Sequence, residues 1–244
     1  YEKLSQLIEL QIQGGTSAIT ICGTTGESAT LKDPEHIAVI AHCVKAVAGR
    51  IKVIAGTGSN ETDHAVYLSQ EAQKAGADGL LLVTPYYNKC SPKGLVRHYM
   101  TVADSVQIPA IVYNVPSRTG VSMGVDIYRQ LSEHPLINGV KEASGNISQG
   151  VKEASGNFSS IATMMNMADG CIDVYSGNDD QIVPLLSMGG KGVISVLANI
   201  CPSATAELAG ACLQGDYQKA AAMQIRYMEL IDALFCEVNP IPVK

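Results

Sequence analysis

The sequence predicts an α/β protein, and within this class a (β/α)8 TIM barrel, on three observations. Short apolar runs alternate with longer stretches of helical period, which indicates repeated βα units around a parallel sheet. The chain has 244 residues, close to the roughly 250 that one such barrel needs. Hydrophobic residues make up 46% of the chain and charged residues only 16%, as a large buried core requires. We therefore expect one barrel domain over residues 1–244.

Seven apolar runs are the expected strands, at residues 18–22, 51–55, 79–84, 110–114, 137–141, 172–175 and 192–196. An eight-stranded barrel needs one more strand. The sequence begins instead on an amphipathic helix, whose apolar face is formed by Leu4, Leu7, Ile8 and Ile12. We therefore expect a barrel without its first strand.

Helix boundary signals stand between the expected strands. Asp33 precedes a proline and predicts an N-cap, Gly49 predicts the end of the same helix, and Ser91-Pro92 predicts a second N-cap. Two further helices are expected at 204–213 and 217–235, after the last strand.

Composition excludes several classes of function. The net charge is −6 and Lys and Arg form no cluster, so neither nucleic acid nor an anionic membrane is an expected partner. The seven cysteines include no Cys-x-x-Cys pair, which argues against a zinc site and against a disulfide framework. No apolar run is long enough to span a membrane and the first residues lack a signal-peptide pattern. We expect a soluble, cytoplasmic protein with a small-molecule substrate.

One internal repeat stands out. The octapeptide GVKEASGN at residues 139–146 recurs unchanged at residues 150–157, a spacing of 11 residues from Lys141 to Lys152 (152 − 141 = 11). This period is far too short for a solenoid unit. We interpret residues 139–157 as a local duplication whose two copies compete for one place in the fold.

Polar side chains follow several expected strands: Thr24-Thr25, Tyr86-Tyr87, Tyr113-Asn114 and Lys141. The carboxyl ends of barrel strands face the active site. Lys141 is the most informative, because desolvation lowers the pKa of a buried lysine and leaves a neutral amine that can attack a carbonyl. A lysine that extends to solvent from a strand end is the alternative, and from the strand alone it is favoured.

The remaining candidates each have an ordinary structural alternative. Tyr113 and Tyr87 could relay protons, although an isolated tyrosine is more often a packing residue. Thr24 and Thr25 lie between glycines and could bind a carboxylate, or could belong to a simple tight turn. Arg118 could bind a substrate carboxylate with its planar guanidinium, or be merely solvated. Their shared position at successive strand ends favours a functional site.

Five segments resemble the dihydrodipicolinate synthase family of class I, pyruvate-dependent aldolases, in order and approximate spacing. They are GTTGES (23–28), VTPYYNK (83–89), YNVPSRTG (113–120), VKEASGN (140–146) and GVISV (192–196). The resemblance runs from Tyr1 to Lys244, and as a set these motifs are highly specific. The sequence departs from the family pattern in the missing first strand, in the duplication, and in lacking a C-terminal helical extension.

The resemblance implies a Schiff-base lyase that condenses pyruvate with L-aspartate 4-semialdehyde, in lysine and diaminopimelate biosynthesis, without a cofactor or metal. It also implies a cytoplasmic homotetramer, a dimer of dimers. Lys141 or its duplicate Lys152 would form the imine. The other implied roles are proton transfer by Tyr113, Thr24 and Tyr87, pyruvate binding by Thr25, Gly177 and the backbone of Ile194, and binding of the semialdehyde carboxylate by Arg118.

Two alternatives stay open. Neuraminate lyase and the keto-deoxy-sugar-acid aldolases share the lysine and the first tyrosine, and Arg118 is what favours the synthase. The other is an inactive, truncated family member. In feedback-inhibited members the lysine effector site resembles the cluster of His36, Asn60 and Tyr86, and His64 stands where those members carry a glutamate. We therefore expect weak or absent inhibition by L-lysine.

Between the two lysines we favour Lys141. Alternation would point Ile137, Gly139 and Lys141 to one face of the strand. The second copy would put Ser148 in place of Ile137 in the core, at a cost of roughly 1–3 kcal/mol. Against this, the first copy stores the surplus residues in a loop on the catalytic face, which barrels do tolerate.

Overall fold

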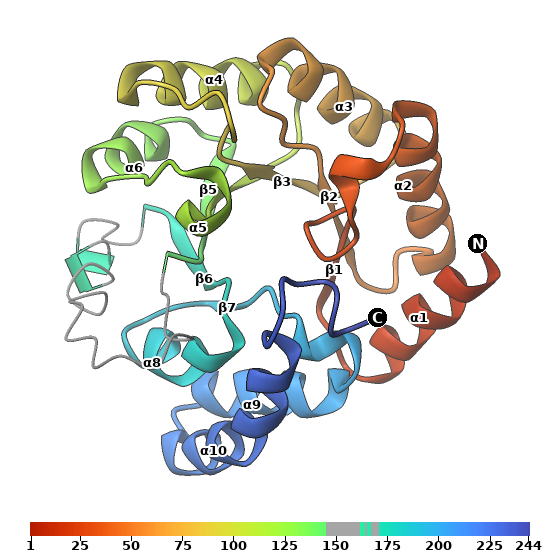
Figure 1. The fold of residues 1–244 in the computed structure, drawn as a ribbon, viewed down its shortest axis with the longest axis vertical. Helices are drawn as coiled ribbons and strands as arrows, with labels where there is room; N and C mark the ends of the chain where they lie inside the picture. Colours follow the sequence, from red (N-terminus) through yellow and green to blue (C-terminus); the bar gives the residue numbers. More distant parts are fainter. Residues whose placement is uncertain (145–161, 164, 167–170) are drawn as a thin grey trace.

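The computed structural model describes residues 1–144, 162–163, 165–166 and 171–244. Within these residues seven parallel strands form one sheet in sequence order, β1 to β7. Figure 1 shows the strands curling around a centre with the helices outside them. The strands are β1 Ala18–Ile21, β2 Lys52–Gly56, β3 Gly79–Val83, β4 Ala110–Asn114, β5 Ile137–Glu142, β6 Asp173–Ser176 and β7 Gly192–Val193.

The helices alternate with the strands, as the βα pattern predicts. The α-helices are α1 Glu2–Gln13, α2 Asp33–Val47, α3 Thr62–Lys74, α4 Pro92–Asp104, α5 Pro116–Thr119, α6 Val125–Ser132, α8 Ile182–Ser187, α9 Pro202–Leu213 and α10 Tyr217–Leu234. Three short 3-10 helices are η1 Ser28–Thr30, η2 Asp179–Gln181 and η3 Leu197–Asn199. The barrel architecture is confirmed.

The sheet stays open between its two edge strands. Among the described residues no strand joins β7 to β1, as expected from a sequence that begins on a helix. The two sides are connected by α1, which lies in the outer ring of helices (Figure 1) and packs against α2 and α9. The Gln11 side-chain amide also donates a hydrogen bond to the Ala198 carbonyl at 2.7 Å. The helical layer therefore continues across the gap in the sheet.

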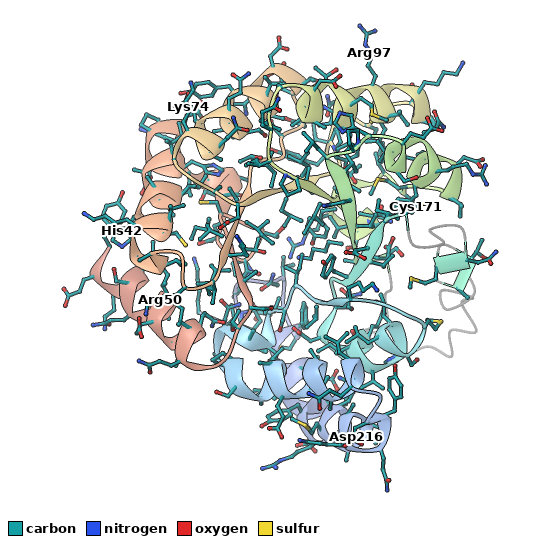
Figure 2. All side chains as sticks on the ribbon, turned by 180° about the vertical axis from the view of Figure 1, so that it is seen from behind. His42, Arg50, Lys74, Arg97, Cys171 and Asp216 are labelled. Atoms are coloured by element: carbon teal, nitrogen blue, oxygen red, sulfur yellow. The ribbon has the colours of Figure 1, made fainter. Side chains whose placement is uncertain are left out.

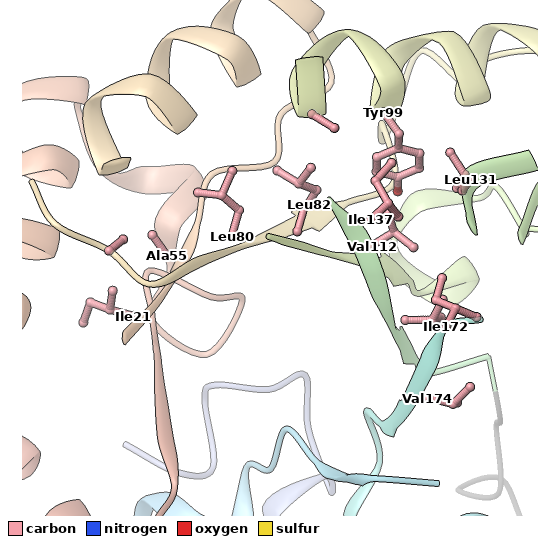
Figure 3. Packing of buried hydrophobic residues seen from close by; sticks show 14 of the residues in the cluster. Ile21, Ala55, Leu80, Leu82, Tyr99, Val112, Leu131, Ile137, Ile172 and Val174 are labelled. Atoms are coloured by element: carbon pink, nitrogen blue, oxygen red, sulfur yellow. The ribbon is translucent and has the colours of Figure 1, made fainter. Parts of the chain in front are cut away.

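The outer face of the sheet carries the main core. Strand residues such as Leu80, Leu82, Val112 and Val174 are buried to within a few per cent and pack against the helices. Figure 3 shows them with Tyr99 and Leu131, which come from α4 and α6. This continuous apolar layer fixes which side of each strand faces outward, and hence which side faces the barrel centre.

The inner face buries a smaller cluster. Leu81, Tyr113, Val115 and Ala143 form it, with Ile111 and Ile194 packed against them. Because strand side chains alternate between faces, Leu81 and Tyr113 point inward while their neighbours Leu82 and Val112 belong to the outer core. The inner face therefore carries the residues available for chemistry.

A bulge in β5 corrects one expectation. Ala110 pairs with Ile137, but Ile111 pairs with Gly139, so Asn138 is an extra residue without a partner in β4. The bulge reverses the alternation, and Ile137 packs in the outer core with Val140. The expectation that Ile137 shares a face with Lys141 is wrong. Ile137 is still only 1% exposed, so the burial cost of Ser148 in its place still holds.

One predicted N-cap is confirmed and another is wrong. The Ser91 hydroxyl accepts a hydrogen bond from the Gly94 N–H at 3.2 Å and caps α4. At α2 the N-cap is Lys32, and Asp33 lies in the first turn, where its carboxylate pairs with His64 at 2.9 Å. A hydrogen bond between the two side chains thus takes the place of the expected cap.

The surface carries scattered charges. In Figure 2 the side chain of Arg97 projects away from the helical ring. None of the helices in the described part of the chain has both the length and the apolar composition of a transmembrane segment.

Candidate functional site

The ends of β4 and β5 place Lys141 beside Tyr113. The two residues are register partners in adjacent parallel strands. Lys141 is 9% exposed and Tyr113 is 6% exposed, and the Lys141 Nζ lies 4.2 Å from the centre of the Tyr113 ring. Lys141 therefore does not extend to solvent; its amine is held inside the barrel against an aromatic side chain.

Gly177 makes room for the lysine. A Cβ atom at this position would lie 2.6 Å from the Ala143 Cβ and 3.1 Å from the Lys141 Cε. Only glycine fits so close an approach. The sequence placed Gly177 near the pyruvate through a family resemblance, and the structure places it against the lysine side chain.

Ile194 lies on the other side of the same inner cluster. It follows β7, and its N–H donates to the Ser176 carbonyl at 2.8 Å. Its side chain packs in the inner cluster that contains Tyr113 and Ala143. The predicted strand over 192–196 is shorter than expected, because β7 ends at Val193 and Ile194 begins the loop. This brings an irregular stretch of backbone to the inner cluster.

Thr24 and Thr25 lie in a tight turn after β1. The Gly26 N–H donates to the Gly23 carbonyl at 3.1 Å, and the Glu27 N–H donates to the Thr24 carbonyl at 3.0 Å. The Thr25 Oγ1 accepts a hydrogen bond from the Asn239 Nδ2 at 3.0 Å. The tight-turn interpretation is thus correct, and the turn also presents a threonine hydroxyl to the C-terminal segment.

Arg118 meets that same segment from the opposite side. It lies in α5, the short helix after β4, and its Nη2 donates to the Asn239 main-chain oxygen at 2.7 Å. The turn after β1 and the helix after β4 are therefore joined through one asparagine. In Figure 1 the C-terminal segment, in dark blue, ends beside the turn that follows β1.

The predicted residues described so far lie in two groups, one around Lys141 and one around Asn239. The structure does not place two further predicted residues in either group. Tyr87 is 91% exposed, so its side chain does not pack against Lys141 or Tyr113 within the chain. Its φ of 68° lies in the left-handed region that non-glycine residues rarely adopt. Lys152 lies outside the described residues, whereas the first copy of the repeat forms β5.

A buried carboxylate next to the lysine was missed in the sequence. Glu142 is 6% exposed and accepts hydrogen bonds from the Asn114 Nδ2 at 3.1 Å, the Tyr128 hydroxyl at 2.8 Å and the Ser144 N–H at 2.8 Å. Burial, and secondly the Glu142 charge, raise the pKa of Tyr128 well above its usual value, which keeps that hydroxyl a donor. This network fixes the end of β5 from which Lys141 projects.

A second buried carboxylate fixes the loop that carries Ile194. Asp179 is 1% exposed, and its Oδ2 accepts from the N–H groups of Val196 at 2.9 Å and Leu197 at 2.8 Å. Burial raises the pKa of this carboxyl. The side chain of Gln224 in α10 donates to the Asp179 carbonyl at 2.9 Å. The sequence signal for this role is an acidic pair, Asp179-Asp180, separated by two residues from the end of β6.

A cavity of about 360 Å³ lies at the other end of the strands. It is lined by the amino-terminal parts of the strands, with Ile54, Leu80 and Ile111 among its walls and the Lys52–Asp78 ion pair at its edge. None of the predicted site residues lines it. In barrels that end of the strands serves stability rather than chemistry, so we assign the site to the carboxyl ends.

Comparisons with known proteins show the family to which the chain belongs. A family model described as the dihydrodipicolinate synthetase family matches residues 1–244. A 4-hydroxy-tetrahydrodipicolinate synthase from Caldicellulosiruptor saccharolyticus is 52% identical over 244 residues, which covers the whole of this chain and 79% of the relative.

Solved structures give the same result. A dihydrodipicolinate synthase from Aquifex aeolicus superposes with a TM-score of 0.93 at 45% identity, covering the whole of this chain and 80% of that one. A chloride-inhibited dihydrodipicolinate synthase from Acinetobacter baumannii, solved in complex with pyruvate, superposes with a TM-score of 0.92 at 40% identity, covering 99% of this chain and 79% of that one.

Proposed function

The chain belongs to the dihydrodipicolinate synthetase family and has the lyase activity of its 4-hydroxy-tetrahydrodipicolinate synthase relatives, and on this premise we propose which residues carry the reaction. Lys141 forms a Schiff base with pyruvate, and the enzyme condenses that adduct with L-aspartate 4-semialdehyde. The observation that carries the proposal is the buried Lys141 amine, 4.2 Å from the centre of the Tyr113 ring.

The first half of the reaction needs a nucleophile and a proton carrier in one closed place. The neutral Lys141 amine attacks the pyruvate carbonyl carbon, the carbonyl oxygen leaves as water, and a C=N bond replaces C=O. Tyr113, next to the amine, gives and takes back the protons. Thr25, Gly177 and the backbone of Ile194 hold the pyruvate.

The second half forms the new carbon–carbon bond. The imine loses a methyl proton and becomes an enamine, whose carbon attacks the semialdehyde aldehyde. Arg118 binds the carboxylate of this second substrate with its planar guanidinium. The substrate amine then attacks the imine carbon, which closes the ring and releases the Lys141 amine and 4-hydroxy-tetrahydrodipicolinate. No step in this route calls for a cofactor.

Tyr87 gives a reason to propose an assembly. A tyrosine that is 91% exposed in a strained backbone conformation is explained if it inserts into a neighbouring copy. With Thr24 it would complete the proton relay to Tyr113 across the subunit interface. We propose a homotetramer, a dimer of dimers, in the cytoplasm, where its seven unpaired cysteines would stay reduced. Sedimentation of Tyr87→Phe and of the wild type tests the assembly.

The test of the proposed function is trapping with pyruvate. Incubation with pyruvate and borohydride followed by intact mass measurement should give one stable pyruvyl adduct per chain, and none without pyruvate. Absence of the adduct, under conditions that trap a control aldolase, would support the inactive alternative. An adduct together with turnover of sugar-derived aldehydes and not of the semialdehyde would support the neuraminate lyase alternative.

A further inference from the structure

Asn239 forms hydrogen bonds to residues proposed for both substrates. Its side-chain Nδ2 donates to the Thr25 Oγ1 at 3.0 Å, and its main-chain oxygen accepts from the Arg118 Nη2 at 2.7 Å. Thr25 belongs to the proposed pyruvate site and Arg118 to the proposed semialdehyde site. One residue thus bridges two substrate groups more than ninety positions apart in the sequence.

The Asn239 side chain is buried, although its neighbours in the chain are open to solvent. Asn239 is 7% exposed, whereas Val238 is 66% and Ile241 is 60% exposed. Its Oδ1 is buried and has no hydrogen-bond partner among the described residues. A buried amide is costly unless its groups are satisfied, so burial of Asn239 calls for a reason beyond covering an apolar surface.

Anchoring of the C-terminal segment does not supply that reason, since the segment is held elsewhere. Lys244 forms an ion pair with Glu27, and Val243 packs against the cluster of Leu197, Ile231 and Leu234. Both contacts lie outside the substrate groups. The segment therefore has anchors other than the Asn239 side chain, whose hydrogen bond goes to Thr25.

We propose that Asn239 is a positioning residue for the reaction: through its side-chain amide it orients the Thr25 hydroxyl for pyruvate, and through its main-chain oxygen it orients the Arg118 guanidinium for the second substrate. This inference rests on the proposed function. The amide donor occupies a lone pair of Thr25 Oγ1 and turns the hydroxyl proton away from Asn239, toward a substrate carboxylate.

The two bonds can be separated by mutation, because one uses the side chain and the other the backbone. Asn239→Ala removes the donor to Thr25 and keeps the main-chain acceptor for Arg118. We expect a rise of about three- to tenfold in the KM for pyruvate, the size of one lost hydrogen bond, with the KM for the semialdehyde changed less than about twofold. Val238→Ala, in the same segment, is the matched control and should change neither constant.

Asn239→Asp makes a second, sharper variant of similar shape. The carboxylate accepts from Thr25 where the amide donated, and it places a negative charge where pyruvate brings its own. We expect a larger rise in the pyruvate KM than Asn239→Ala gives, by the repulsion of like charges at close range. The expected order of pyruvate KM values is Val238→Ala, then Asn239→Ala, then Asn239→Asp.

A double-mutant cycle decides whether Asn239 acts through Thr25. If it does, adding Asn239→Ala to a Thr25→Val enzyme changes the pyruvate KM no further. Full additivity, an Asn239→Ala enzyme that matches the Val238→Ala control, or equal effects on both substrates would each overturn the proposal. Pyruvate trapping of the wild type keeps the two questions apart, because an adduct with no effect of Asn239→Ala refutes only the positioning role.

Discussion

The outer and inner faces of the same curled sheet differ in what their side chains do. The outer face contributes Leu80, Leu82, Val112 and Val174 to one continuous apolar core. The inner face buries a small cluster in which Tyr113 and Ala143 lie beside the lysine amine and Gly177. Alternation along each strand separates the two tasks, so that changes on one face should leave the task of the other intact.

The largest effect on stability is expected on the outer face. Leu82 is fully buried, and Leu82→Ala removes packing and leaves a cavity, which should lower the free energy of unfolding by about 2–5 kcal/mol. The kcat of the folded fraction should stay unchanged. Urea unfolding and steady-state kinetics measure both quantities, with the exposed Leu7→Ala as control. A stable Leu82→Ala enzyme with a reduced kcat would break the separation of the two faces.

At the mouth of the inner face, Arg118→Ala should weaken the second substrate. A lost charge-assisted hydrogen bond is worth about 1.5–3 kcal/mol, which corresponds to a rise of roughly 10- to 150-fold in the semialdehyde KM. Stability should change little, because the guanidinium makes one described hydrogen bond, to Asn239. Arg97→Ala, on the outward side of α4, is the control. Unchanged semialdehyde kinetics would remove the main reason to prefer this substrate over sugar aldehydes.

Asp180 lies next to Asp179 in η2. Its ionisation should make the stability of this part of the fold depend on pH. Burial, with repulsion from Asp179 and Asp232, raises the pKa of this carboxyl to about 6. A carboxyl whose pKa is raised in the folded state stabilises the fold fully below its unfolded pKa of about 4, and the contribution is lost as pH rises through about 6.

Asp180→Asn should therefore raise the free energy of unfolding at pH 7.5 by about 1–2 kcal/mol and leave it nearly unchanged at pH 4. Chemical unfolding at the two pH values checks this. A gain of equal size at both pH values would show that the effect does not come from ionisation of Asp180, and a loss only at pH 7.5 would show that Asp180 is ionised and satisfied in the fold.

The smallest effect concerns L-lysine. Both ring nitrogens of His64 are engaged within the chain, Nε2 with Asp33 at 2.9 Å and Nδ1 with the Ser59 hydroxyl at 3.0 Å. His64 itself offers an imidazole and no carboxylate to an ammonium group, and the Oδ1 of the neighbouring Asp33 is already bonded to its ring. We expect the wild type to keep nearly its full rate at saturating L-lysine in initial-rate assays. Tight, saturable inhibition near neutral pH would show that the effector site does not depend on this position.

The sequence predicted the βα order because apolar runs and caps are local signals. It did not predict the bulge at Asn138, because one extra residue leaves the apolar pattern unchanged while reversing the face of Ile137. The early end of β7 at Val193 was missed for a similar reason, since the apolar run continues beyond it.

The site residues divide in the same way. Strand ends and a specific family pattern singled out Lys141, Tyr113 and Gly177 as candidates, and the structure brings the three together. Glu142 and Asn239 were not, because their partners come from distant parts of the chain, such as Tyr128 and Thr25. Such hydrogen bonds exist only after the chain has folded.

The measurement that tests the account most directly is peptide mapping of the borohydride-trapped pyruvate adduct. The inner face of β5 is formed by the first copy of the repeat, so we predict the label on Lys141. Lys152→Arg should trap pyruvate like the wild type, and Lys141→Arg should trap none while unfolding at the same urea concentration. A label on Lys152 in the wild type, or an adduct that survives in Lys141→Arg, would contradict the assignment of Lys141 as the Schiff-base residue.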